Sequence, residues 1–161
     1  MKSIRNIAFS ALLAVGAFTM VTYTACTKDE CKDVVCQNGG TCVTGTCNCP
    51  TGYEGTNCET ITRDKFVGTY TGTENCTVGS DTYSITIDKN SDDLKMTYKN
   101  VYNQNYSAVC TVTNTTTFTF NETQNGATFT GTGTLNGNTL TVDYTITDAL
   151  SSNTCKYIGV K

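Results

Sequence analysis

The stretch that decides the fold is FTFNETQNGATFTGTGTLNGNTLTVDYTI, residues 118–146. It contains two Asn-Gly pairs, Asn125-Gly126 and Asn136-Gly137, and this dipeptide is the preferred chemistry of two-residue type I′ hairpin turns. Around the pairs, apolar and polar residues alternate with period two, as they do in half-buried strands. The stretch therefore predicts three antiparallel strands joined by two tight turns.

The two turns also predict a register. Phe129 would lie opposite Tyr144, and the middle strand would place two glycines between bulky neighbours on one face. The residues concerned are Gly131 and Gly133, with Phe120 and Phe118 on one side and Val142 and Leu140 on the other. Glycines beneath large side chains suit a strongly curved sheet, which favours a barrel over a flat sandwich.

The same alternation extends through residues 66–161, where threonine, tyrosine, asparagine and glycine dominate. It recurs in Tyr83-x-Ile85-x-Ile87, Leu94-x-Met96-x-Tyr98 and Tyr106-x-Ala108-x-Cys110-x-Val112, without a helical period. We expect a mostly β chain whose second domain, residues 66–161, is an antiparallel β-barrel of about eight strands. A β-sandwich is the alternative fold.

The start of this domain, Phe66-Val67-Gly68-Thr69-Tyr70, resembles the opening strand of lipocalin-like barrels. The resemblance implies a glycine and an aromatic residue at the barrel floor. The domain is shorter than a full lipocalin and lacks the C-terminal helix of that family. The later run from Gly131 to Leu140 resembles small secreted β domains of Bacteroidetes lipoproteins.

Three cysteines fall in this domain: Cys76, Cys110 and Cys155. In an up-and-down barrel the first and last strands are antiparallel neighbours, so the end of the first lies beside the start of the last. Cys76 and Cys155 occupy those two places, and we expect them to be bonded. Cys110 is then a free thiol on the apolar face, and no histidine or basic neighbour in the sequence suggests a reactive role.

Six more cysteines, between Cys31 and Cys58, are spaced by gaps of four, five, four, one and eight residues. Together with Asn38-Gly39-Gly40 and Gly52-Tyr53-Glu54-Gly55, this segment, residues 31–59, resembles an EGF-like domain. Six cysteines alone allow fifteen connectivities. The resemblance implies one of them: Cys31 with Cys42, Cys36 with Cys47, and Cys49 with Cys58. A polar linker, residues 60–65, is expected to follow.

An apolar run, residues 7–21, behind a basic start predicts a signal peptide over residues 1–25 rather than a spanning helix. Thr24-Ala25-Cys26 resembles a bacterial lipobox, although Tyr23 stands where the usual pattern has leucine. The resemblance implies that Cys26 carries the lipid anchor, including palmitate or a similar acyl chain. Ordinary signal-peptidase cleavage is the alternative.

The anchor and export linker, residues 26–30, contain Lys28-Asp29-Glu30. This motif resembles the signal that exports lipoproteins to the cell surface in Bacteroidetes-type bacteria. A solvated charged linker is the alternative interpretation. The expected location is the outer membrane, lipid-anchored and facing the exterior.

Composition excludes several function classes. Without the leader, nine of the eleven basic residues remain against fourteen acidic ones, which argues against nucleic acid as a partner. The chain has no histidine, which excludes Ser-His-Asp and Cys-His catalysis and imidazole metal sites. In an exported chain the cysteines predict disulfides rather than zinc ligands. The EGF-like segment offers too few acidic ligands for calcium, so we expect no metal and no cofactor.

These observations predict a non-enzymatic cell-surface lipoprotein that binds or adheres to an extracellular protein or glycan. The alternative is a membrane-tethered, lipocalin-like carrier of a small neutral ligand; after Arg63 the chain has no arginine to hold a carboxylate. A hydrolase with paired carboxylates is a third class, but residues such as Glu122 and Asp143 are scattered. A packed barrel interior would favour binding, and an apolar cavity with converging hydroxyls would favour the carrier.

Overall fold

A computed structural model describes residues 29–161 of the chain. In the cysteine-rich segment two small antiparallel sheets form, one from β1 (Thr41–Val43) and β2 (Thr46–Asn48), the other from β3 (Tyr53–Glu54) and β4 (Thr60–Ile61). Cys58 is the only fully buried apolar side chain that the structure describes in this segment. Disulfides rather than a hydrophobic core must therefore hold it together.

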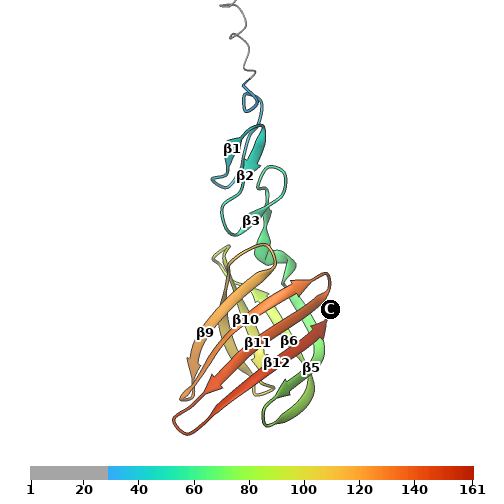
Figure 1. The fold of residues 1–161 in the computed structure, drawn as a ribbon, viewed down its shortest axis with the longest axis vertical. Coiled ribbons are helices and arrows are strands. Elements are labelled where there is room, and N and C mark those ends of the chain that lie inside the picture. The colour runs from blue at the N-terminus through green and yellow to red at the C-terminus, as the bar shows by residue number, and fades with distance from the viewer. Residues whose placement is uncertain (1–28) are drawn as a thin grey trace, which may run out of the picture. The chain divides into compact units, whose positions relative to one another are not determined.

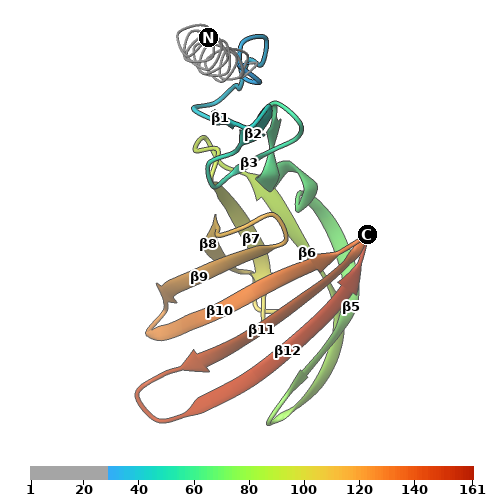
Figure 2. The same ribbon diagram turned by 45° about the horizontal axis from the view of Figure 1, so that its top comes forward.

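The eight strands that follow form a closed antiparallel barrel, as predicted, and the β-sandwich is excluded. They wrap around the barrel in the order β10-β11-β12-β5-β6-β7-β8-β9, and Figure 2 shows β9 to β12 and β5 side by side. Their bounds are β5 (Gly68–Cys76), β6 (Gly79–Lys89), β7 (Lys95–Val101), β8 (Tyr106–Val112), β9 (Thr117–Gln124), β10 (Ala127–Asn136), β11 (Thr139–Thr147) and β12 (Ser152–Val160). The first and last barrel strands, β5 and β12, are paired neighbours (Figure 1).

One of the two predicted hairpin registers is correct. Between β9 and β10 the loop residues are Asn125 and Gly126, with φ of 53° and 81°, as a type I′ turn requires. Between β10 and β11 the loop residues are instead Gly137 and Asn138, because Asn136 pairs with Thr139. Of these two only Gly137 has a positive φ, 58°, which fits a type II′ turn with glycine first.

The pairing of β10 with β11 is therefore shifted by two residues from the prediction. Gly131 lies opposite Tyr144, and Phe129 lies opposite Ile146 rather than Tyr144. Because side chains alternate with period two, a shift of two residues leaves every side chain on its predicted face. The predicted core is consequently correct although the register is not.

The inner face of the barrel is filled by its own side chains. Tyr70, Tyr98, Tyr157, Phe66 and Phe118 are all fully buried. A Cβ atom at Gly133 would lie 2.0 Å from the ring of Phe118, so this ring occupies the space that the glycine leaves free. The glycines of β10 are thus required by the packing of rings across the barrel.

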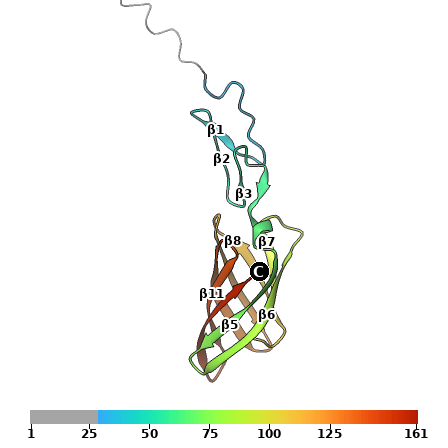
Figure 3. The same cartoon turned by 90° about the vertical axis from the view of Figure 1, so that its right-hand side faces the viewer.

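One end of the barrel is closed by the 3-10 helix η1 (Thr62–Lys65) and the residue after it. Phe66 packs edge-on against Phe118, with ring centroids 5.5 Å apart, and its carbonyl accepts a hydrogen bond of 2.8 Å from the Tyr70 hydroxyl. The chain end lies at the same rim, where the Lys161 ammonium donates to the Val67 carbonyl at 3.2 Å. Figure 3 marks the C-terminus near this end of the barrel.

Residues 60–65, expected to form a polar linker, are ordered as β4 and η1, and Thr62 and Arg63 are buried. The physical reason is Arg63, whose guanidinium is a rigid fork of donors. Its Nη1 donates to the Asn90 carbonyl at 2.6 Å and also to the Asp92 carbonyl, and its Nη2 donates to Asp93 Oδ1 at 3.2 Å. Arg63 thereby attaches the start of the barrel domain to the loop between β6 and β7.

Candidate functional site

The predicted anchor lies outside the described residues, as do Cys26 and Lys28 of the anchor and export linker. Asp29 and Glu30, the acidic pair of the export motif, are described and are exposed. Within residues 29–161 the structure contains no helix long and apolar enough to cross a membrane.

The structure joins Cys36 to Cys47 and Cys49 to Cys58, the pairs that the EGF resemblance implies. Cys31 and Cys42 are also disulfide-bonded. In the barrel Cys76 is bonded to Cys155, and these residues lie directly opposite each other in the ladder between β5 and β12.

Cys110 is a free, fully buried thiol on the inner face of β8. Burial raises the pKa of this thiol well above its usual value. A thiol that resists ionisation is a poor nucleophile, so Cys110 serves the core as a small apolar side chain.

The end of the barrel opposite η1 contains a buried carboxylate that sequence reasoning missed. Glu74, on β5, is 3% exposed and points into the barrel. Its Oε1 accepts a hydrogen bond of 2.7 Å from the Tyr83 hydroxyl and a second, shorter one from the Tyr144 hydroxyl. Burial, together with the nearby carboxylate, raises the pKa of both phenols, so that they remain neutral donors.

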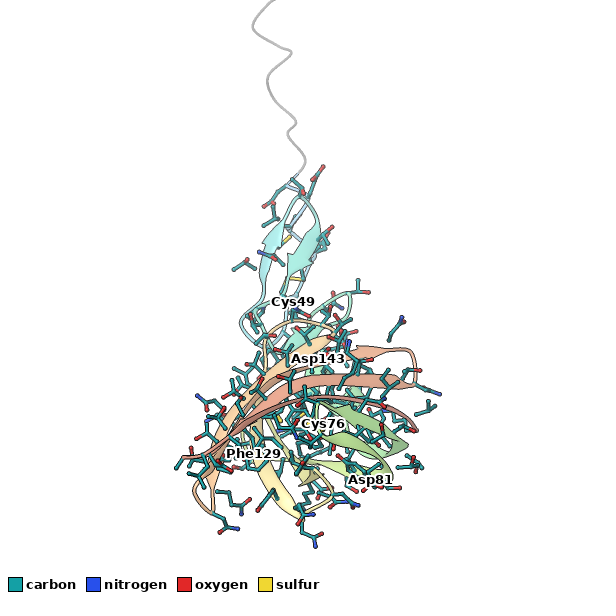
Figure 4. The ribbon with its side chains drawn as sticks, turned by 60° about the horizontal axis from the view of Figure 1, so that its bottom comes forward. Cys49, Cys76, Asp81, Phe129 and Asp143 are labelled. Atoms are coloured by element: carbon teal, nitrogen blue, oxygen red, sulfur yellow. A yellow bond between two sulfur atoms is a disulfide. The ribbon has the colours of Figure 1, made fainter. Side chains whose placement is uncertain are left out.

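The barrel wall is incomplete beside Glu74. β6 pairs with β7 only from Thr86 to Lys89, so the first half of β6 has no strand partner on that side. A hollow of about 250 Å³ lies there, and its wall includes Glu74, Asp81, Tyr102 and Gln104. Figure 4 views the barrel from below and labels Cys76 and Asp81 near this region.

The loop between β7 and β8, which forms one wall of the hollow, has an unusual backbone. Tyr102, Asn103 and Asn105 in this loop, and Asn100 near the end of β7, all have positive φ, between 50° and 62°. Asparagine tolerates the left-handed region, whereas a bulky aromatic residue such as Tyr102 does so only when its surroundings hold it there. The Asn153 side chain donates to the Tyr102 hydroxyl at 3.1 Å, and Asn103 donates to Asp81 at 2.6 Å.

The sequence did carry a signal for Glu74. Alternate residues of a strand face the same side of the sheet, and on β5 one such set is Tyr70, Gly72, Glu74 and Cys76. Glu74 lies between an inward tyrosine and a cysteine at the rim, so its side chain had to face the interior. A carboxylate at an interior position is rare unless it is paired or hydrogen-bonded, and this rarity marks the position as unusual.

One group of potential metal ligands occurs among the described residues. It consists of an oxygen of Glu74 and the sulfurs of Cys76 and Cys155, which lie within 4.8 Å of one another. Those sulfurs are bonded to each other. A disulfide is not a thiolate, and one carboxylate is too little for a hard cation, so this group does not suit a metal ion.

The outer face of the barrel has a different character, with rows of hydroxyl groups. Across β5 and β6, the hydroxyls of Thr71 and Ser84 form a hydrogen bond of 2.8 Å, and those of Thr73 and Thr82 form one of 3.2 Å. Across β8, β9 and β10 the outer face has an open groove with a volume of about 530 Å³. Its wall includes Val109, which is 42% exposed, together with the hydroxyls of Thr111, Thr119, Thr130 and Thr132.

Comparison with protein families found an EGF-like domain at residues 26–58. The structure has disulfides in the described part of this region, and both findings agree with the resemblance seen in the sequence. Comparison with solved structures found no match for the chain. The chain therefore contains an EGF-like domain followed by a closed eight-stranded β-barrel.

Proposed function

We propose that this chain is a non-enzymatic lipoprotein of the outer cell surface that binds an external protein or glycan through the outside of its barrel. The observation that carries the proposal is the groove across β8, β9 and β10, where threonine hydroxyls surround the half-exposed Val109. Hydroxyl groups around a small apolar patch suit a hydroxylated ligand or a polar peptide, which needs both hydrogen bonds and a contact surface.

The packed interior supports this proposal over the carrier. The large aromatic side chains of the core are fully buried against one another, so the barrel axis is occupied by protein. The last arginine, Arg63, is engaged by loop carbonyls at the closed end and is not free to hold a carboxylate ligand.

The binding surface is tested with lysine substitutions on two faces of the full chain. The double variant Thr119→Lys/Thr130→Lys places bulky charged side chains in the groove, and Thr71→Lys/Thr73→Lys does the same on β5. Both pairs are exposed, so neither should disturb the core. We expect the parent protein to be retained by a panel of surface glycans and extracellular matrix proteins. Retention of the groove variant by the panel should be at least tenfold lower than that of the parent, and retention of the β5 variant should equal that of the parent. Equal retention of both variants, or none by the parent, would contradict the proposal.

The anchor and surface location need separate experiments in the producing cells. Cys26→Ala should abolish palmitate labelling and release the protein from the membrane fraction, because acyl chains on this cysteine are the proposed attachment. Replacement of Lys28, Asp29 and Glu30 by alanine should leave labelling intact but protect the protein from protease added outside the cell. Unchanged labelling or unchanged cleavage would refute the anchor or the export signal respectively.

A further inference from the structure

The groove of the proposed function lies over a seam in the barrel wall, a stretch where β8 and β9 run without pairing. The ladder between these strands joins residues 110–112 to residues 118–120 and ends there. β8 begins at Tyr106 and β9 extends to Gln124, so residues 106–109 and 121–124 have no partner across the seam in this ladder. Two strand edges are therefore left without the backbone pairing that a closed sheet provides.

The seam contains a backbone group whose hydrogen bond comes from a substitute partner. Were the ladder to continue, Val109 would pair with Asn121 and Ser107 with Thr123. The Ser107 amide donates instead to Oε1 of the Gln124 side chain, at 3.1 Å. A side-chain amide thus takes the place of a strand carbonyl at one position. An edge whose backbone groups lack strand partners is a template for pairing with another chain.

Both edges already have strand geometry, because each is paired on its other side. Residues 107–109 pair with residues 97–99 of β7, and residues 121–124 pair with residues 127–130 of β10. Inside the barrel, the Tyr106 ring packs against the Phe129 ring with centroids 4.9 Å apart, so protein fills the space beside the seam. A strand added here meets ordered edges, and the cost of ordering the site at binding is therefore small.

The groove has the chemistry of a site for an extended, uncharged segment. Val109 and Asn121, the first residues beyond the ladder, lie in its wall together with the buried Phe120. The groove therefore opens where the pairing stops. No charged residue occurs in the lining that the structure describes for it. Residues 106–109 and 121–124 contain no lysine and no proline, which commonly protect exposed strand edges from other chains.

We propose that the seam binds one extended, uncharged segment of a partner protein, which adds to the free edges of β8 and β9 as a strand. This inference rests on the proposed function and narrows its partner to a polypeptide, because a glycan has no peptide backbone to complete a strand ladder. Main-chain hydrogen bonds along the seam hold the segment, and its outward side chains contact the threonines of the groove. Each free edge spans about 13 Å at roughly 3.3 Å per residue, which suits a segment of about four to six residues.

The probe is a capped synthetic peptide with the sequence of β8, residues 106–112, in which serine replaces Cys110. This peptide is uncharged, and in the register of the existing ladder it can pair with residues 118–124 of β9. A matched peptide carries N-methyl groups on alternate residues, which removes the backbone donors of one edge but keeps every side chain. Binding to the full chain, held in non-ionic detergent, is followed by amide NMR shifts. We expect saturable binding with shifts in residues 106–109 and 121–124, and at least tenfold weaker binding of the N-methylated peptide.

Two pairs of variants test the protein side of the seam. Gln124 pairs with Ala127 across the turn, so the amide of Thr123 points the other way, into the seam. Thr123→Pro removes this donor and should weaken peptide binding at least tenfold, whereas Thr123→Ala keeps it and should bind within about twofold of the parent. Gln124→Ala frees the Ser107 amide and should tighten binding about two- to fivefold. Gln37→Ala, at an exposed glutamine of the EGF-like domain, should leave the affinity unchanged.

Thermal melts establish that each variant is folded before binding is compared. Equal affinity of the plain and N-methylated peptides, or an absence of shifts at the seam, would overturn the proposal. So would a folded Thr123→Pro variant that binds the peptide as tightly as the parent. Sedimentation of the parent without peptide is the further control, since a dimer that forms through the seam would assign the two edges to a second copy of the chain instead.

Retention of the parent by the panel of glycans and matrix proteins separates this inference from the proposed function. If the parent is retained through the groove by a glycan but does not bind the peptide, the proposed function stands and strand addition is wrong. If the peptide binds at the seam but no member of the panel retains the parent, the seam accepts strands and the proposed function is wrong.

Discussion

The disulfide between the first and last strands of the barrel should make a large contribution to stability. Cys76 and Cys155 are 79 residues apart in the chain, so their bridge closes a loop of about eighty residues. In the loop-entropy model such a bridge is worth about 4.5 kcal/mol at 25 °C, and measured values for native bridges start near 2 kcal/mol. We therefore expect the double variant Cys76→Ala/Cys155→Ala to lose between about 2 and 4.5 kcal/mol of the free energy of unfolding.

The melting temperature of the barrel should fall by at least about 8 °C, since a domain of this size loses about 4–8 °C per kcal/mol. Near-UV circular dichroism is a suitable assay, because seven of the nine tyrosines lie in residues 66–161. Removing Cys36 and Cys47, whose bridge spans 11 residues of the EGF-like domain, is the control and should leave the barrel transition in place. A double variant that melts within 2 °C of the parent would refute the loop-closure reasoning.

Three further predictions concern the core, the closed end and pH. Gly133→Ala would put a Cβ atom 2.0 Å from the buried Phe118 ring and should cost about 1–3 kcal/mol in urea unfolding, whereas the outward Thr132→Ser should stay within about 0.5 kcal/mol. Arg63→Met removes the donors to the β6–β7 loop and should cost about 1–3 kcal/mol, with faster hydrogen exchange in residues 90–95; unchanged exchange there would contradict the role of Arg63. Burial raises the pKa of Tyr70 and of Tyr157 from 10.0 to about 12, so their neutral forms stabilise the fold fully below pH 10. The free energy of unfolding, measured by urea titration at each pH, should then fall between pH 10 and 12, and a constant value over this range would contradict the burial of these neutral phenols.

The barrel could be predicted from the sequence because it rests on local rules. Period-two alternation identified the inward faces of the strands, and the neighbouring positions of first and last strands identified the partners of Cys76 and Cys155. The β10–β11 register could not be predicted, since Asn136-Gly137-Asn138 offers two turns of similar local preference. Packing across the barrel, which a sequence does not display, selects between them.

The residues that were missed depend on tertiary contacts. Arg63 was expected in a polar linker, but its hydrogen bonds are with a loop about thirty residues away. Glu74 shares its inward parity with Tyr70 on one strand, but its hydrogen bonds with Tyr83 and Tyr144 exist only once the barrel has formed. The opening beside it arises where β6 and β7 stop pairing, and no residue pattern marks that point.

The choice between the two turns at Gly137 also fixes the dimensions of the barrel. In a closed sheet the accumulated stagger of the strands, the shear, determines their tilt and the barrel radius. A slide of two residues between β10 and β11 keeps each side chain on its face but changes this shear, and with it the width of the interior. A single loop glycine thus helps to set how wide a space the core tyrosines and phenylalanines have to fill. Related chains could widen or narrow the barrel by moving that turn, without exchanging one inward residue for another.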